Sequence, residues 1–240
     1  RAGRLGLRAR GWYKRASPTR PDLLHLPFLF PLQGPLMTEE LDEKDRRHKE
    51  RMVRVKEAHE ARLAAATREK GLLIVNTGAG KGKSSAAIGV VARALGHGLR
   101  VGIIQFIKGT IDTGEAAFFA RLAPQVVMKT LGEGFTWDTQ DRSRDIEAAR
   151  RGWTEAVAML RAPEYDLVVL DELNIVLRYE YLPLQEVLGE LNARREKLHV
   201  VVTGRNAPAE LIEIADLVTE MKQIKHPYRS GVMPQKGIEY

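Results

Sequence analysis

The segment 72–84 constrains the fold of this chain more than any other segment. It reads Leu-Leu-Ile-Val-Asn-Thr-Gly-Ala-Gly-Lys-Gly-Lys-Ser. The apolar start predicts a buried strand, the glycines predict a tight turn, and the final Lys-Ser pair predicts the start of a helix. In this arrangement the backbone N–H groups of the turn and of the first helical turn point at an anion such as phosphate. Glycine suits the turn because a side chain would hold the phosphates off the backbone.

Two side chains of this phosphate-binding loop, or P-loop, are candidate catalytic groups. We expect Lys83 to reach the outer phosphates and the Ser84 hydroxyl to bind Mg²⁺. The usual P-loop spacing places a glycine where this chain has Thr77. A basic, glycine-rich surface loop is therefore an alternative, but the strand before the turn and the helix after it favour a phosphate site. The loop residues expected to bind the nucleotide are Gly78, Ala79, Gly80, Lys81, Gly82, Lys83, Ser84 and Ser85.

Two carboxylates follow another buried strand and are candidate Mg²⁺ ligands. The segment 165–172 contains four consecutive apolar residues and ends in Asp171 and Glu172. A strand of this kind is the usual partner of a P-loop, because it brings a carboxylate near Mg²⁺ at the carboxyl edge of the sheet. Arg205 follows the apolar strand 199–203 at the same edge, and it is either a ligand for ATP or an ordinary surface arginine. The six histidines are scattered, and we expect no zinc site.

The basic charge of the chain is concentrated at its start. The net charge is +7, but residues 1–36 contain seven Arg or Lys and one acid, so the rest of the chain is nearly neutral. We therefore expect no nucleic-acid partner. The absence of cysteine excludes disulfides and thiolate chemistry. No apolar run approaches the ~18 residues that a membrane helix needs, so we expect no membrane partner.

Three segments are expected along the chain. Residues 1–36 contain five of the eleven prolines and predict a disordered leader, either upstream sequence read in ahead of a natural start at Met37 or a transit peptide. Residues 37–70 are charged and rich in helix formers, and they predict a helical arm. Such a polar arm is either solvated or docks on a substrate or a partner subunit. Residues 71–240 form the P-loop domain.

A glycine-rich loop at 132–138 contains two large aromatic residues, Phe135 and Trp137. They lie on no periodic apolar face, whereas Trp153 falls at core spacing in the helix predicted over 141–161. The aromatic pair is either a lid over the core or a platform for a flat ligand. The basic segment 222–240 also allows two interpretations: it folds back over an anionic ligand, or it is a solvated terminus.

Several segments together resemble the ATP:corrinoid adenosyltransferase family, whose members have a P-loop fold. The resemblance runs from Met37 to Tyr240 and is carried by the segments 77–86, 134–137, 170–174, 202–207 and 235–240. It implies an α/β fold of the P-loop NTPase-like (RecA-like) class, with a mostly parallel sheet and helices on both faces. It also implies Mg²⁺ as the cofactor, with ATP and a reduced corrinoid as substrates. One departure is Ala79, where relatives often carry a polar residue such as Asn.

The resemblance implies an unusual transfer. The 5′-deoxyadenosyl group of ATP moves to the Co(I) of a corrinoid and triphosphate leaves, in cobalamin biosynthesis or salvage. Phe135 and Trp137 would pack on the lower face of the corrin. A homodimer, a cytoplasmic location, a reductant such as a flavoprotein and an N-terminal helix that covers the corrin are implied as well. Two other functions stay open: an ordinary Mg²⁺-dependent P-loop NTPase or kinase acting at the γ-phosphate, and a nucleotide-binding regulatory module without turnover.

Overall fold

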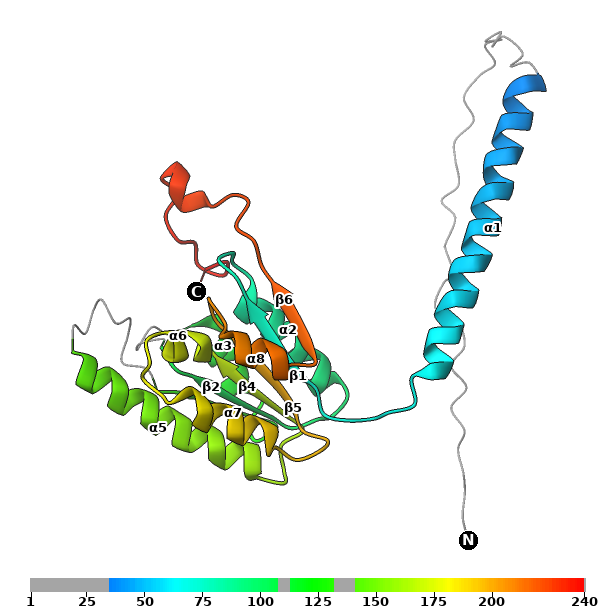
Figure 1. Ribbon diagram of the computed structural model, residues 1–240. Helices are drawn as coiled ribbons and strands as arrows, with labels where there is room; N and C mark the ends of the chain where they lie inside the picture. The colour runs from blue at the N-terminus through cyan, green and yellow to red at the C-terminus, as the bar shows by residue number, and fades with distance from the viewer. Residues whose placement is uncertain (1–34, 108–112, 132–140, 240) are drawn as a thin grey trace. The chain divides into compact units, whose positions relative to one another are not determined.

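The computed structural model describes residues 35–107, 113–131 and 141–239, with side chains from residue 42 onward. These residues fall into two compact units, Arg1–Ala66 and Thr67–Tyr240. Figure 1 labels the elements of both units. Within the described ranges, no helix combines the length and the apolar character that a membrane crossing requires.

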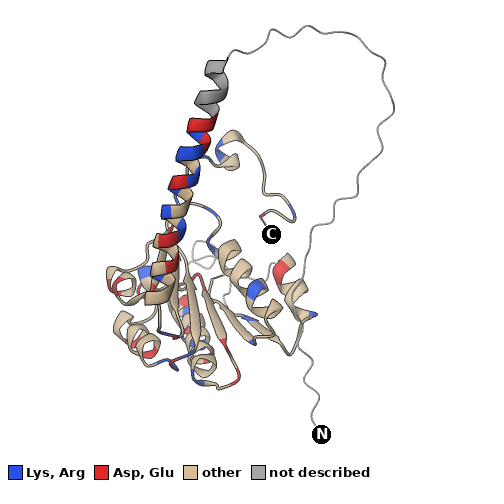
Figure 2. Cartoon of the chain, turned by 90° about the vertical axis from the view of Figure 1, so that its right-hand side faces the viewer, with Lys and Arg blue, Asp and Glu red and all other residues tan. Residues whose placement is uncertain are grey.

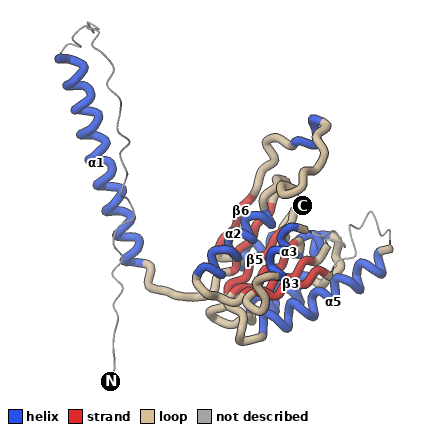
Figure 3. The backbone as a smooth tube through the Cα atoms, turned by 180° about the vertical axis from the view of Figure 1, so that it is seen from behind, coloured by secondary structure: helices blue, strands red, loops and turns tan. Residues whose placement is uncertain are grey.

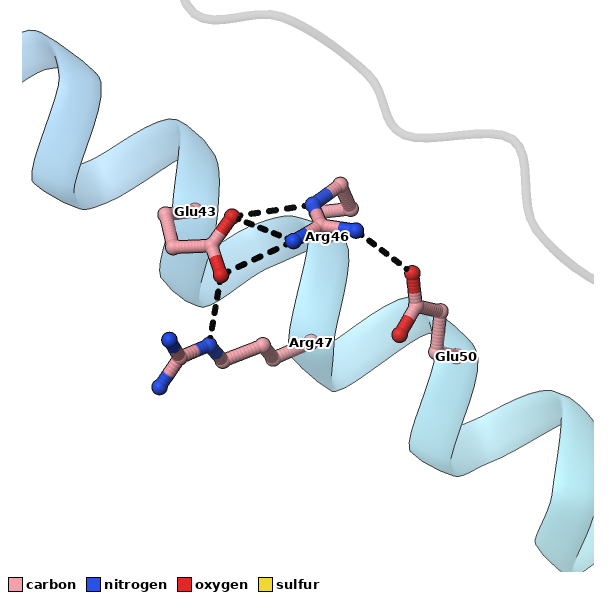
Figure 4. A network of polar contacts seen from close by, with 4 residues as sticks. All are labelled: Glu43, Arg46, Arg47 and Glu50. Carbon is pink, nitrogen blue, oxygen red and sulfur yellow. Dashed lines mark hydrogen bonds and ion pairs between the residues drawn. The ribbon is translucent and has the colours of Figure 1, made fainter.

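The first unit contains helix α1, Pro35–Ala65, which is 31 residues long. The arm predicted over 37–70 is therefore helical, but the helix begins and ends earlier than expected, and a proline suits its start because the first helical N–H groups have no partner within the helix. Acidic and basic side chains alternate along the helix (Figure 2). Arg46 pairs with Glu43 at 2.7 Å and with Glu50 at 3.0 Å, and Arg47 also pairs with Glu43 (Figure 4). Such pairs stabilise an exposed helix by a few tenths of a kcal/mol each, roughly.

The second unit is built on a six-stranded sheet in which all neighbouring strands are parallel. The strand order is β3-β2-β4-β5-β1-β6. The strands are β1 (Leu73–Thr77), β2 (Val101–Gln105), β3 (Val126–Thr130), β4 (Leu167–Asp171), β5 (His199–Thr203) and β6 (Leu217–Glu220). The strand before the P-loop, β1, and the acidic strand, β4, are separated by β5. Because the strands are parallel, their carboxyl ends lie along one edge.

Helices cover both faces of this sheet (Figure 3). They are α2 (Lys83–Gly96), α3 (Gly114–Ala120), α5 (Arg142–Arg161), α6 (Leu173–Arg178), α7 (Leu184–Asn192) and α8 (Ala209–Ile214). One apolar cluster joins one face to side chains of α2 and α3, and another joins the opposite face to side chains of α5, α6, α7 and α8. Trp153 is 4% exposed within the latter cluster, which confirms that it is a core residue. The predicted fold class, a parallel α/β sheet with helices on both faces, is confirmed.

Candidate functional site

The P-loop connects β1 to α2 at the carboxyl edge of the sheet. Gly78 and Gly82 have φ angles of 96° and 104°, a backbone conformation that favours glycine. Gly82 is the residue before the helix, and no side chain caps the helix start. Among the described residues no side chain accepts from the first N–H groups of α2, and the positive end of the helix dipole faces the loop. A helix start of this kind can bind an anion, and the role of these residues in binding phosphate stays a prediction.

Lys83 is buried at the first turn of α2 and is only 6% exposed. Its Nζ donates a hydrogen bond to the carbonyl oxygen of Gly80. Burial lowers the pKa of the ammonium group, and the positive charges of Arg205 and Lys81 lower it further, whereas Glu172 and Asp171 oppose the shift. Within the loop this ammonium group has a neutral carbonyl as its partner, and a bound phosphate would give it an anionic partner.

The backbone of Met221 packs against the P-loop from outside. A Cβ atom on Gly78 would lie 2.5 Å from the Met221 carbonyl oxygen, and one on Gly80 would lie 2.8 Å from it. Both glycines are buried, whereas Ala79, Lys81 and Gly82 are exposed. Glycine is thus required at positions 78 and 80 because the chain that follows β6 packs against them. The sequence suggested a different reason for these glycines, namely close approach of the phosphates to the backbone.

Four polar side chains at the ends of neighbouring strands form a hydrogen-bonded row. Thr130 Oγ1 donates to Gln105 Oε1 at 3.1 Å, and Gln105 Nε2 donates to Asp171 Oδ2 at 3.0 Å. Thr203 Oγ1 donates to the other carboxylate oxygen of Asp171 at 2.7 Å. The row crosses β3, β2, β4 and β5, and it fixes the orientation of the Asp171 carboxylate at the edge of the sheet.

Glu172 follows Asp171 at the turn into α6, with a φ of 63°. Its backbone N–H donates to Thr203 Oγ1 at 2.9 Å. Next to it, Gly204 has a φ of 127°, and a Cβ there would lie 3.2 Å from a carboxylate oxygen of Glu172 and 2.8 Å from Asn174 Cβ. The strand ends of β4 and β5 are therefore packed tightly beside the Glu172 carboxylate.

Two of the three residues expected to bind Mg²⁺, Ser84 and Asp171, lie close to each other, and the third, Glu172, does not line the cavity that they share. Ser84 and Asp171 line the same small cavity, together with Gln105 and Glu115. Mg²⁺ prefers oxygen ligands and is usually held by one or two carboxylates while it keeps several waters. Ser84 and Asp171 supply a hydroxyl and a carboxylate of the kind that Mg²⁺ binds, but the cavity between them is mainly apolar, and its volume of about 10 Å³ is too small for the waters of the ion. No group of three or more His, Cys, Asp or Glu that could hold a metal occurs in the described ranges.

The other predicted residues that the structure describes lie at or near this edge. Arg205 is exposed directly after β5, and its charge acts on Lys83. Ser85 is exposed in the first turn of α2. Phe135 and Trp137 lie outside the described residues, so their role stays a prediction. Sequence reasoning missed Gln105, Thr130 and Thr203, although a single polar residue at the end of an apolar strand was the available signal.

A separate cavity of about 510 Å³ lies at the opposite edge of the sheet. It is lined by Arg68, Glu69, Lys70, Leu72, Lys197 and His199. This cavity lies near the starts of β1 and β5, whereas the P-loop follows the end of β1. It is therefore not part of the candidate site.

Comparisons with known proteins agree on one family. Residues 69–240 match the family model described as ATP:corrinoid adenosyltransferase BtuR/CobO/CobP. The corrinoid adenosyltransferase of Pseudomonas aeruginosa is 53% identical over 201 residues, which cover 84% of this chain and 99% of that protein. The Escherichia coli K12 corrinoid adenosyltransferase is 46% identical over 197 residues, 82% of this chain and 99% of that protein. The corrinoid adenosyltransferase CobA of Salmonella typhimurium is 45% identical over the same shares.

Solved structures with a related arrangement are more distant. The flagellar accessory protein FlaH from Methanocaldococcus jannaschii aligns with a TM-score of 0.44 and 12% identity, over 63% of this chain and 71% of that one. The RadB recombinase aligns with a TM-score of 0.39 and 13% identity, over 66% of this chain and 77% of that one.

Proposed function

We propose a reaction for this site on the premise that the chain belongs to the ATP:corrinoid adenosyltransferase family. The protein is an enzyme that transfers the adenosyl group of ATP to a corrinoid in cobalamin metabolism. In the step we propose, the electron pair of Co(I) attacks C5′ of the ribose. A cobalt–carbon bond forms, the C5′–O bond breaks, and triphosphate leaves with the bridging oxygen and the bonding electrons. Cobalt is formally oxidised to Co(III).

The P-loop stabilises the leaving group in this proposal. Triphosphate carries several negative charges, so the step needs cations and N–H donors placed in advance around the phosphates. Lys83 exchanges the Gly80 carbonyl for a phosphate oxygen, and the uncapped N–H groups of α2 donate to the same anion. Lys81 and Arg205 add positive charge from the exposed side. No residue has to act as a base, because reduced cobalt is itself the nucleophile.

We assign the Mg²⁺ site to Ser84 and Asp171, with Glu172 beside them. Mg²⁺ would supply further neutralisation of the phosphate charge. The support is that Ser84 and Asp171 lie close together, and that hydrogen bonds from Gln105 and Thr203 orient the carboxylate before any ligand arrives. The ordering of a metal ligand by its neighbours is commonly as important as the ligand itself.

We place the corrin at Phe135 and Trp137, in the segment between β3 and α5. The end of β3 lies at the same edge as the P-loop, because all strands are parallel. Two flat apolar rings there would exclude water from the lower face of cobalt and so make Co(II) easier to reduce. A flavoprotein reductant and a homodimer complete the proposal.

The observation that carries this proposal is the family match over 69–240, which includes the P-loop, the acidic strand end and Arg205 in one continuous stretch. The competing function is hydrolysis or transfer of the γ-phosphate, which the same P-loop chemistry would allow. The aromatic segment favours the adenosyl transfer, because a hydrolase has no need of a flat apolar platform.

The test is to incubate the protein with Mg²⁺, ATP and a chemically reduced corrinoid while the visible spectrum and the phosphate products are followed. We expect a light-sensitive alkyl-cobalt product and an equal amount of triphosphate. ADP and phosphate formed without any need for corrinoid would instead establish an NTPase. Retained ATP binding without turnover would establish a regulatory module.

A further inference from the structure

The chain after β6 passes over the P-loop and returns to it. We call Met221–Glu239 the C-terminal strap. In the sheet Glu220 pairs with Thr77, so the strap begins directly beside the residue that precedes the P-loop. Figure 1 shows the strap leaving the end of β6 and turning back toward the β1–α2 connection.

The first residue of the strap holds the loop through its backbone. Gly80 N–H donates to the Met221 carbonyl at 2.6 Å, and Met221 N–H donates to the Thr77 carbonyl at 2.9 Å. The N–H of Gly80 therefore points at the strap, and its carbonyl accepts from Lys83. The peptide groups on both sides of Gly80 are therefore held by hydrogen bonds within the protein.

The far end of the strap contacts the loop through an ion pair between Glu239 and Lys81. Of the described residues from Lys222 to Glu239, Glu239 alone forms a hydrogen bond or ion pair with the rest of the domain. Apolar side chains of the strap, such as Ile224 and Met233, are 92% and 77% exposed, so little packing holds the segment down. The ion pair with Lys81 is therefore the main polar contact at this end of the strap, and it leaves the Glu239 side chain only 16% exposed.

Lys81 is the cation of the loop that solvent reaches most easily. Its side chain is 52% exposed, whereas Lys83 is buried. A carboxylate on Lys81 occupies the ammonium group that the proposed function gives to the phosphates. It also adds a negative charge near a polyanion, and that interaction is repulsive.

We propose that Glu239 is a positioning residue that competes with triphosphate for Lys81 and so promotes product release. This inference rests on the proposed function, because adenosyl transfer leaves the whole triphosphate in the cradle that stabilised it. Every cation that favours the leaving group also holds the product. The Glu239 carboxylate offsets this by pairing with Lys81 again once the nucleoside end has left.

The experiment measures binding of inorganic triphosphate with Mg²⁺ by calorimetry, without corrinoid. Glu239→Gln should lower the Kd for triphosphate by about threefold to tenfold, since one repulsive charge and one competitor are lost. The gain should shrink with added salt, because salt screens the charge of Lys81, which is half exposed. The matched control is Glu213→Gln, which removes the same charge from an exposed position on α8 and should leave the Kd unchanged.

Repeating the measurement in a Lys81→Met variant shows whether Glu239 acts by competing for Lys81 or through a structural role. Lys81→Met should weaken triphosphate binding, and adding Glu239→Gln to it should lower the Kd by less than in the parent protein, because only the direct repulsion is then relieved. In turnover, Glu239→Gln should show stronger inhibition by added triphosphate than the parent protein. An unchanged or raised Kd in Glu239→Gln, or an equal gain in the Lys81→Met background, would overturn the proposal. Because triphosphate binding needs no corrinoid, such a failure is distinct from a failure to form alkyl-cobalt.

Discussion

Replacing Thr203 by valine tests whether the hydrogen-bonded row at the strand ends orients Asp171 for Mg²⁺ binding. Thr203 is 0% exposed, and valine has nearly the same shape. The substitution removes a 2.7 Å hydrogen bond to the Asp171 carboxylate and a 2.9 Å hydrogen bond from the Glu172 N–H. A hydrogen bond to a charged group is worth about 1.5–3 kcal/mol, and a buried N–H left without an acceptor costs about 1 kcal/mol or more. We therefore expect Thr203→Val to lower the free energy of unfolding by about 2–4 kcal/mol.

Thr203→Ser is the matched control for this substitution. It keeps the hydroxyl and removes one buried methyl group, which should cost about 1 kcal/mol. Denaturant unfolding of the two variants and the parent measures both changes. The Mg²⁺ concentration that half-saturates turnover should rise about tenfold to hundredfold in Thr203→Val, as is usual when a ligand loses the group that orients it. Equal losses of stability in the two variants, or an unchanged Mg²⁺ requirement in Thr203→Val, would refute the reasoning.

Three further predictions concern other parts of the site. Lys83→Ala should abolish ATP binding in calorimetry, because the phosphates lose a buried counter-charge. Normal turnover in this variant would refute the assignment of the P-loop as the phosphate-binding site. Burial lowers the pKa of Lys83 below its ordinary 10.5, so above the lowered pKa the folded protein loses a proton that the unfolded chain keeps. As pH rises through that window, the free energy of unfolding should increase while ATP affinity falls, and Lys83→Met should remove both trends. Trp137→Ala should leave ATP binding intact and slow the reaction most when Co(II) must be reduced on the enzyme, whereas loss of folding would identify Trp137 as a core residue.

Much of the fold could be predicted from local patterns in the sequence. The apolar runs of β1, β2, β4 and β5 are continuous because both faces of the sheet are covered, and such runs are readily recognised. The helix α6 was missed because it has only six residues, Leu173–Arg178, and follows the strand with no loop between them. Short helices of this kind are set by packing rather than by periodicity.

The residues of the candidate site that belong to short sequence motifs could be predicted from the sequence. Lys83, Ser84 and Asp171 follow from motifs whose spacing is local. The support from Gln105 and Thr203 depends on which strands lie next to β4, and that order follows from the three-dimensional packing alone. The same limit applies to Met221, whose contact with Gly80 joins segments far apart in the chain.

The central claim is that this site holds the phosphates so that carbon, and not phosphorus, is attacked. The most direct measurement uses ATP labelled with ¹⁸O at the atom that joins C5′ to the α-phosphorus, with reduced corrinoid as the acceptor. Mass spectrometry of the products then locates the label. Adenosyl transfer predicts that all of the ¹⁸O leaves in triphosphate. Label retained on the nucleoside or on ADP would mean attack at phosphorus, and it would contradict the account.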